Sequence, residues 1–224
     1  MGKGKAGVID EDQCRANGWL WNGAGGMSQA TLILAHGAGA PMDSAFMQRM
    51  AELLAVRGIG VLRFEFPYMA ARRADGGKRP PNPQAQLLEC WRQVYSQVRK
   101  EVAGPLAIGG KSMGGRMASL LADELAADAL VCLGYPFHAV GKQDKPRVAH
   151  LAELRTPSLI VQGERDAMGN RETVVSYTLS PAIRLEWLVA GDHDLKPLKA
   201  SGFTHEQHLQ TAADAVAAFV SGAR

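Results

Sequence analysis

The chain of 224 residues has few cysteines, little net charge and no long apolar run. Its three cysteines, Cys14, Cys90 and Cys132, are an odd number without metal-binding or redox spacing, which argues against a disulfide scaffold. The net charge of +3 is too small and too scattered to favour a nucleic-acid partner. No apolar run is long enough to span a bilayer, and no apolar block follows the N-terminal lysines as it would in a signal peptide. These absences predict a cytoplasmic protein with no nucleic-acid or membrane partner.

The composition is that of an ordinary globular protein, with 46% apolar and 21% charged residues. The length suits one domain with a full hydrophobic core. Residues 1–17 are polar and contain glycine and lysine, so we predict a flexible N-terminal extension followed by a single domain over 18–224. Cys132 lies in an apolar segment and is expected to be a reduced core residue. The sequence leaves open a monomer or a homodimer.

Short apolar segments alternate with amphipathic ones along the chain. The pattern predicts strands at 19–21, 31–35, 59–64, 106–109, 129–133, 158–162 and 184–189. It predicts four helices. The first is capped at residue 43 or 44 and ends at 57, and the second follows a loop at 67–83 and ends near residue 99. The third runs through 113–125, and the fourth begins after a capping box at Thr204 and Gln207. Such alternation favours a three-layer α/β fold, with a mostly parallel sheet and helices on both faces. Only about twenty residues connect the strands at 129–133 and 158–162, which is close to ordinary connection lengths and leaves no room for a large lid domain.

The segment 106–115 contains the most informative motif. An apolar run ends in Gly110-x-Ser112-x-Gly114, and an amphipathic segment follows at once. A sharp turn between strand and helix lifts the serine hydroxyl clear of the sheet, and glycines allow that turn because a Cβ would clash with neighbouring backbone. Ser112 is therefore the candidate nucleophile.

An acid and a histidine follow the next predicted strands in the required places. Asp166 comes after the strand at 158–162, and His193 comes after the strand at 184–189. The carboxyl ends of parallel strands meet at one edge of a sheet, where sites gather. His193 would accept the proton of Ser112, and Asp166 would orient the imidazole and stabilise its charged form. Glu164 and Asp192 are rival acids, and the worse-placed histidines are His138, His150, His205 and His208.

A serine nucleophile also needs donors for the developing oxyanion. The backbone N–H of Met113 would supply one, and that of Ala38 or Gly39 the other. These last two residues lie in a glycine-containing turn directly after the buried strand at 31–35. His36 begins this turn, and we favour a role in bracing it by hydrogen bonding over direct catalysis.

Other side chains have two readings each. Lys111 either sits over the acyl site or points outward, and Tyr68 and Phe137 either line the substrate pocket or belong to the core. A group of basic residues follows one strand near the predicted site and is either a solvated surface or attracts acidic substrates: Arg72, Arg73, Lys78 and Arg79.

The string Gly110-Lys111-Ser112 also ends like a phosphate-binding loop. That loop requires a glycine at position 105, where this chain has Pro105. Residues 106–108 are apolar and predicted as strand, so no loop remains to wrap a phosphate. Nucleotide binding is therefore not favoured.

Four strings carry a family resemblance: H-G-A-G-A-P-M-D-S (36–44), F-P-Y-M (66–69), G-K-S-M-G-G-R (110–116) and G-Y-P-F (134–137). From about residue 19 to the C-terminus the chain resembles the α/β-hydrolase superfamily, in which the order serine, acid, histidine is the expected one. Within it, the chain is similar to the small, lidless, dienelactone-hydrolase-like branch. The strings resemble a bacterial group with animal relatives in a testis-expressed protein and a subunit of a chromatin-modifying complex.

The resemblance implies a hydrolase fold with Ser112, Asp166 and His193 as a catalytic triad. Dienelactone hydrolases usually carry a cysteine nucleophile, so Ser112 departs from them. The expected activity is cleavage of a small-molecule carboxylic ester or thioester through an acyl-enzyme, without a metal or organic cofactor. The alternative is an interaction protein that keeps the fold and performs no chemistry, because fold alone does not imply activity.

Overall fold

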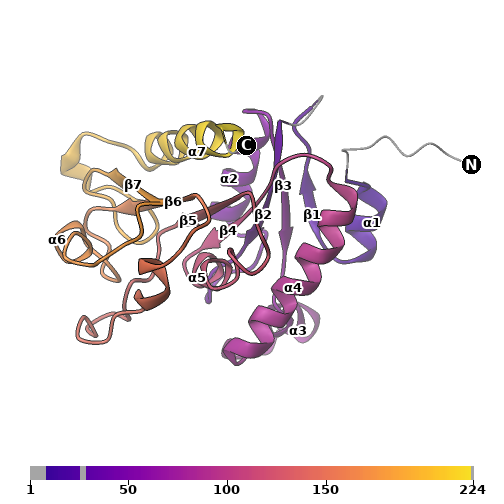
Figure 1. The fold of residues 1–224 in the computed structure, drawn as a ribbon, viewed down its shortest axis with the longest axis horizontal. Coiled ribbons are helices and arrows are strands. Elements are labelled where there is room, and N and C mark those ends of the chain that lie inside the picture. Colours follow the sequence, from indigo (N-terminus) through magenta and orange to yellow (C-terminus); the bar gives the residue numbers. More distant parts are fainter. Residues whose placement is uncertain (1–8, 26–28, 223–224) are drawn as a thin grey trace, which may run out of the picture.

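A seven-stranded sheet forms the centre of the molecule in the computed structural model, which describes residues 9–25 and 29–222 (Figure 1). The strand order is β1-β3-β2-β4-β5-β6-β7. β1 runs antiparallel to β3, and the other neighbours are parallel. The strands are β1 (Leu20–Asn22), β2 (Ala30–Ala35), β3 (Ile59–Phe64), β4 (Leu106–Lys111), β5 (Ala129–Leu133), β6 (Ser158–Gly163) and β7 (Ile183–Leu188). The mostly parallel sheet predicted from the sequence is confirmed.

Burial explains why these segments are strands. Every residue of β2, β3, β4, β5 and β6 is buried, as expected for parallel strands that are covered on both faces. Strand β7 lies at the edge of the sheet and is only partly buried.

Helices cover both faces of the sheet and make three layers (Figure 1). On one face, α2 (Ala45–Ala55) packs with α7 (His205–Gly222), and Leu54 and Val216 lie in that core. On the other face, α4 (Gln84–Glu101) packs with α5 (Met113–Ser119), and Trp91 and Met117 lie in the second core. The shorter helices are α1 (Glu11–Ala16), α3 (Pro67–Asp75) and α6 (Arg171–Val174). The expected three-layer fold is therefore present.

The structure corrects the expected flexible extension over part of its length. Residues 11–16 form α1, which the Asp10 carboxylate caps by accepting a hydrogen bond from the N–H of Asp12. Ile9 and Cys14 are buried in the core beside α4, so this segment packs on the domain. Residues 1–8 of the predicted extension lie outside the described part of the chain.

Two other segments differ from the sequence prediction. Residues 67–75 form α3 rather than a loop, since Pro67 suits the first helical turn and Gly76 ends the helix at φ 72°. Helix α5 ends at residue 119 rather than 125. Beyond it, the Asp123 carboxylate accepts hydrogen bonds from the backbone N–H groups of Arg155 and Thr156, which ties residues 120–126 to the loop before β6.

The connection between β5 and β6 contains only a 3₁₀ turn, Ala149–Ala152, as regular structure. Over residues 9–25 and 29–222, no large lid domain covers the sheet edge, as predicted. Among the described residues, no helix has the length and apolar character needed to cross a membrane.

Candidate active site

Ser112 occupies a strained turn between β4 and α5. Its backbone has φ 51° and ψ −117°, a conformation that L-residues rarely adopt. Both flanking glycines are required, because a Cβ on Gly110 or on Gly114 would lie 2.6 or 2.5 Å from the carbonyl oxygen of Ala35. The N–H of Ser112 donates to the carbonyl of Leu133 at 3.0 Å, which ties the turn to β5. The hydroxyl is thereby presented at the carboxyl edge of the sheet.

His193 and Asp166 complete a hydrogen-bonded chain with Ser112. His193 Nε2 lies 2.8 Å from Ser112 Oγ, and His193 Nδ1 lies 2.7 Å from Asp166 Oδ2. When Nδ1–H donates to the carboxylate, Nε2 is left free to accept the hydroxyl proton of Ser112. The structure therefore brings together the three side chains that the sequence singled out, in the predicted order of contact.

Asp166 is fully buried, and its carboxylate has further donors. Oδ1 accepts a hydrogen bond from the N–H of Met168 at 2.8 Å, and Oδ2 accepts one from Gln162 Nε2 at 2.8 Å. A buried charge needs such partners to remain stable. Sequence reasoning missed Gln162, although a polar residue directly after the apolar run 159–161 of β6 was a usable signal.

The rival acids have other partners. Glu164 pairs with Arg171 at 2.7 Å and accepts a hydrogen bond from the N–H of Ala190 at 3.0 Å. Asp192 Oδ1 accepts hydrogen bonds from the N–H groups of Asp194 and Lys196 within its own loop. These geometries favour Asp166 over both rivals.

The turn after β2 presents free backbone donors. Within the described chain, no backbone hydrogen bond occupies the N–H of Ala38, Gly39 or Met113. His36 is fully buried beneath this turn, and its two ring nitrogens contact the Gly37 carbonyl at 2.7 Å and the Phe66 N–H at 3.1 Å. The acceptor and the donor together require the neutral Nδ1–H tautomer, and burial lowers the pKa of His36 accordingly. His36 thus braces the turn, as predicted.

Tyr68 packs against the turn after β2, and its role in substrate binding stays a prediction. Tyr68 is buried, and its hydroxyl donates to the carbonyl of Ala38 at 2.9 Å, with the carbonyl of Gly37 at 3.4 Å. In a trans peptide the C=O and the following N–H point in opposite directions. Holding these two carbonyls against Tyr68 therefore turns the N–H groups of Ala38 and Gly39 away from it. Tyr68 is a positioning residue for the turn.

Phe137 belongs to the core, so its predicted place in the substrate pocket is wrong. It is fully buried, with its ring edge-to-face with Tyr135 at 4.8 Å and stacked with Tyr177 at 6.1 Å. Gly169 is packed so closely that a Cβ there would lie 2.5 Å from the Phe137 ring.

Lys111 does not point outward, so that reading is wrong, and its place relative to the acyl site stays a prediction. Lys111 is only 7% exposed, and its Nζ donates to the backbone carbonyl of His193 at 2.8 Å and pairs with Asp194 at 3.1 Å. Burial lowers the pKa of Lys111, while Asp194 raises it. Gly134 leaves the room for this contact, because a Cβ there would lie 2.5 Å from the His193 oxygen. Lys111 therefore connects the turn that carries Ser112 (the serine turn) to the loop that carries His193 (the histidine loop).

Carboxylates compensate two of the four basic residues near the site, Arg73 and Arg79. Arg73 forms ion pairs with Asp43 and Glu65 at 2.8 and 2.6 Å, and Arg79 pairs with Asp75. Such pairs weaken the field that would attract an acidic substrate. The structure favours the solvated-surface interpretation for this group.

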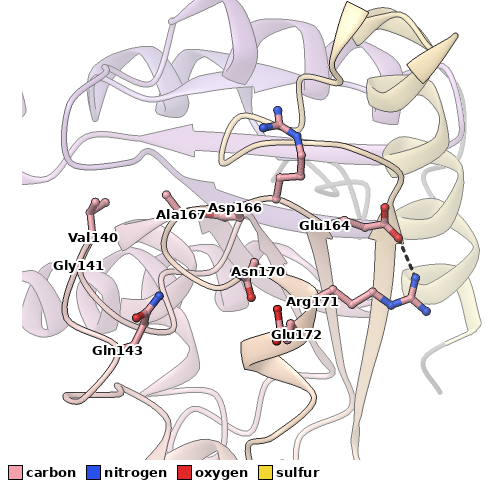
Figure 2. Close-up of a pocket in the computed structure, with 10 residues that line it drawn as sticks. Val140, Gly141, Gln143, Glu164, Asp166, Ala167, Asn170, Arg171 and Glu172 are labelled. Carbon is pink, nitrogen blue, oxygen red and sulfur yellow. Dashed lines mark hydrogen bonds and ion pairs between the residues drawn. The ribbon is translucent and has the colours of Figure 1, made fainter. Parts of the chain in front are cut away.

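An open groove of about 810 Å³ lies beside the loop that carries Asp166 (Figure 2). Its walls come from the loop after β5, with Val140 and Gln143, and from residues 164–172 after β6. The Arg171–Glu164 ion pair lies along one side (Figure 2). The residues that line it include neither Ser112 nor His193, so the groove borders the acid loop rather than the nucleophile.

The sequence profile of a family described as an alpha/beta hydrolase domain matches residues 28–221. The chain therefore belongs to the α/β-hydrolase family.

Solved structures of the same fold agree with this assignment. Est1E from Butyrivibrio proteoclasticus, solved with ferulic acid bound, is 15% identical, with 91% of this chain and 95% of that chain covered and a TM-score of 0.67. XC6422 from Xanthomonas campestris, a serine hydrolase without a lid, is 19% identical over 86% and 81% of the two chains, with a TM-score of 0.61. A dienelactone hydrolase from Anabaena variabilis is 18% identical over 90% and 89%, with a TM-score of 0.66. These likenesses show a shared fold, and the dienelactone-hydrolase-like branch and the animal relatives stay predictions.

Proposed function

We propose that this protein is a serine hydrolase that cleaves a small-molecule carboxylic ester or thioester through an acyl-enzyme. The observation that carries the proposal is the continuous hydrogen-bonded chain from Ser112 through His193 to the buried Asp166, with contacts of 2.8 and 2.7 Å. It starts at a strained serine turn in a chain of the α/β-hydrolase family. An interaction protein without chemistry would have no need for this strain.

Catalysis begins when Ser112 Oγ attacks the carbonyl carbon and its proton passes to His193 Nε2. The N–H groups of Met113 and of Ala38 or Gly39 stabilise the oxyanion, and one such donor contributes about 3 kcal/mol to the transition state. The C–O or C–S bond then breaks, and His193 returns the proton to the leaving alkoxide or thiolate. Water, deprotonated by His193, attacks the acyl carbon, releases the acid and restores the Ser112 hydroxyl.

The first experiment is intact-mass analysis after treatment with a fluorophosphonate, on the folded protein, on heat-denatured protein and on Ser112→Ala. We expect one adduct on the folded protein, mapped by peptide digestion to Ser112, and none on the variant or the denatured chain. Ser119 is the informative comparison because it too shares a hydrogen bond with a histidine, His150, at 2.8 Å. An adduct on Ser119, or no adduct on folded protein, would contradict the proposal, and the second result would favour a binding role.

The acid is tested by Asp166→Asn against Glu164→Gln and Asp192→Asn. Replacing the acid of such a triad by asparagine lowers kcat about 10⁴-fold, because the imidazole is held in the wrong tautomer. We expect a loss of that order for Asp166→Asn and changes of less than about threefold in the two controls, measured with a p-nitrophenyl ester. A larger loss in either control would reassign the acid.

A further inference from the structure

Three basic side chains gather beside α5 without a carboxylate partner: Arg116, Arg147 and His150. In the described part of the chain, no ion pair includes Arg116 or Arg147. The Nε of Arg116 is buried and has no hydrogen-bond partner, and its Nη1 lies 3.4 Å from Gln84 Oε1. This contrasts with Arg73 and Arg79, whose charges are compensated. A half-buried guanidinium without a counter-charge is costly, and a bound anion would offset that cost.

Within the cluster, Arg116 lies next to the turn that carries Ser112 of the candidate triad. The N–H of Arg116 donates to the carbonyl of Ser112 at 3.0 Å, so the two residues are one helical turn apart, about 6 Å along the axis. Side chains of a helix lean toward its N-terminus, which carries the Arg116 side chain back toward the level of Ser112. Residues 147–150 belong to the loop that leaves the carboxyl end of β5, and Gln84 is the first residue of α4.

Side-chain hydrogen bonds hold the cluster together. His150 Nε2 lies 2.8 Å from Ser119 Oγ and 3.4 Å from the Tyr135 hydroxyl, which also lies 3.5 Å from the carbonyl oxygen of Arg147. These contacts fasten the loop at 147–150 against α5. Burial, followed by the charge of Arg116, lowers the pKa of His150, while burial and the nearby charge of Arg147 lower the pKa of Arg116. The environment is therefore short of negative charge.

We infer that Arg116 and Arg147 form an anion-binding subsite near Ser112, with His150 fastening the Arg147 loop to α5, and that the substrate is an ester or thioester that carries a carboxylate. The inference rests on the proposed function. Guanidinium groups bind carboxylates through two parallel N–H···O bonds, which supply orientation as well as charge. A carboxylate anchored there would hold a short dicarboxylic half-ester with its carbonyl carbon near Ser112 Oγ.

The test compares p-nitrophenyl hemisuccinate with p-nitrophenyl butyrate, which differ mainly in the distal charge. The readout is the ratio of kcat/KM for the two esters in the wild type, Arg116→Gln, Arg147→Gln and a control, Arg92→Gln. Arg92 lies exposed on α4 and pairs with Glu124 at 2.6 Å. We expect the anionic-to-neutral ratio to fall about tenfold to a hundredfold in Arg116→Gln, and at least about threefold in Arg147→Gln. A ratio within twofold of the wild type in both variants, or an equal fall in Arg92→Gln, would overturn the inference.

A second measurement separates this inference from the proposed function. The Tm is followed with sodium succinate, sodium phosphate or sodium chloride at constant ionic strength. Succinate should raise the Tm of the wild type and of Arg92→Gln but not of Arg116→Gln, even if the protein hydrolyses neither ester and the proposed function fails. Stabilisation by phosphate alone, with no change in the ester ratio, would mean that the cluster binds a free inorganic anion and would overturn the substrate assignment. No rise with either anion would overturn the site itself.

Discussion

Replacing Lys111 by methionine would test how the serine turn and the histidine loop are held together. The substitution keeps the length of the side chain and removes the Nζ that donates to the His193 carbonyl at 2.8 Å and pairs with Asp194 at 3.1 Å. Lys111 directly precedes Ser112, and the carbonyl that it contacts belongs to His193. The contact therefore fixes the backbone of the nucleophile relative to the backbone of its base. We expect Lys111→Met to lower kcat more than it lowers stability.

The two effects can be sized from the contacts. A hydrogen bond from a charged donor contributes about 1.5–3 kcal/mol, and a pair with an exposed carboxylate such as Asp194 adds about 0–1 kcal/mol. Methionine recovers part of this loss because a buried ammonium is no longer desolvated. The net cost in the free energy of unfolding should therefore be within about 2 kcal/mol. A shift of about 1 Å between reacting groups can cost a hundredfold in rate, so we expect kcat to fall about tenfold to a hundredfold.

The assay combines kcat and KM for a neutral p-nitrophenyl ester with urea unfolding, on Lys111→Met, Asp194→Asn and Lys196→Met. Lys196 is an exposed lysine of the same loop and is the matched control. Asp194→Asn removes the ion pair and keeps the bond to the His193 carbonyl, so its kcat should change less than about threefold. A kcat within twofold of the wild type in Lys111→Met, or an equal loss in Lys196→Met, would refute the positioning role.

Two further predictions concern Tyr68 and His150. Tyr68→Phe removes the hydroxyl that holds the Ala38 carbonyl and should lower kcat about threefold to tenfold with KM little changed. The control Tyr177→Phe removes a buried hydroxyl that has no hydrogen-bond partner and should not lower kcat. Equal losses of kcat in the two variants would contradict the role of Tyr68. Burial and then Arg116 lower the pKa of His150 to about 4, so the unfolded chain, in which histidine titrates near 6.5, binds the proton first. The free energy of unfolding should therefore fall between pH 6.5 and 4 more steeply in the wild type than in His150→Gln, and parallel urea midpoints over that range would exclude this contribution.

Local patterns in the sequence predicted the framework of the fold and of the site. Mostly apolar runs indicated buried parallel strands, and the glycines at 110 and 114 indicated a turn with no room for a Cβ at those two positions. The sequence singled out Ser112, Asp166 and His193 because each follows a strand and the carboxyl ends of parallel strands meet at one edge, and the three side chains do form hydrogen bonds with one another. The capping box of Thr204 and Gln207 was also correct, with the Gln207 N–H donating to the Thr204 hydroxyl at 3.2 Å.

What each side chain contacts was decided by the tertiary structure. Lys111 meets a carbonyl that is 82 residues away along the chain, and Arg73 meets an aspartate 30 residues away. Tyr68 and Phe137 have the size and polarity of pocket residues, yet packing places one under the turn after β2 and the other in the core. Periodicity and turn chemistry act between near neighbours, so a sequence displays them directly. Which side chains are buried, and which charges have a partner, depends on the distant segments that the sheet brings together. The absence of a counter-charge at Arg116 is one such property, and it exists only once the chain has folded.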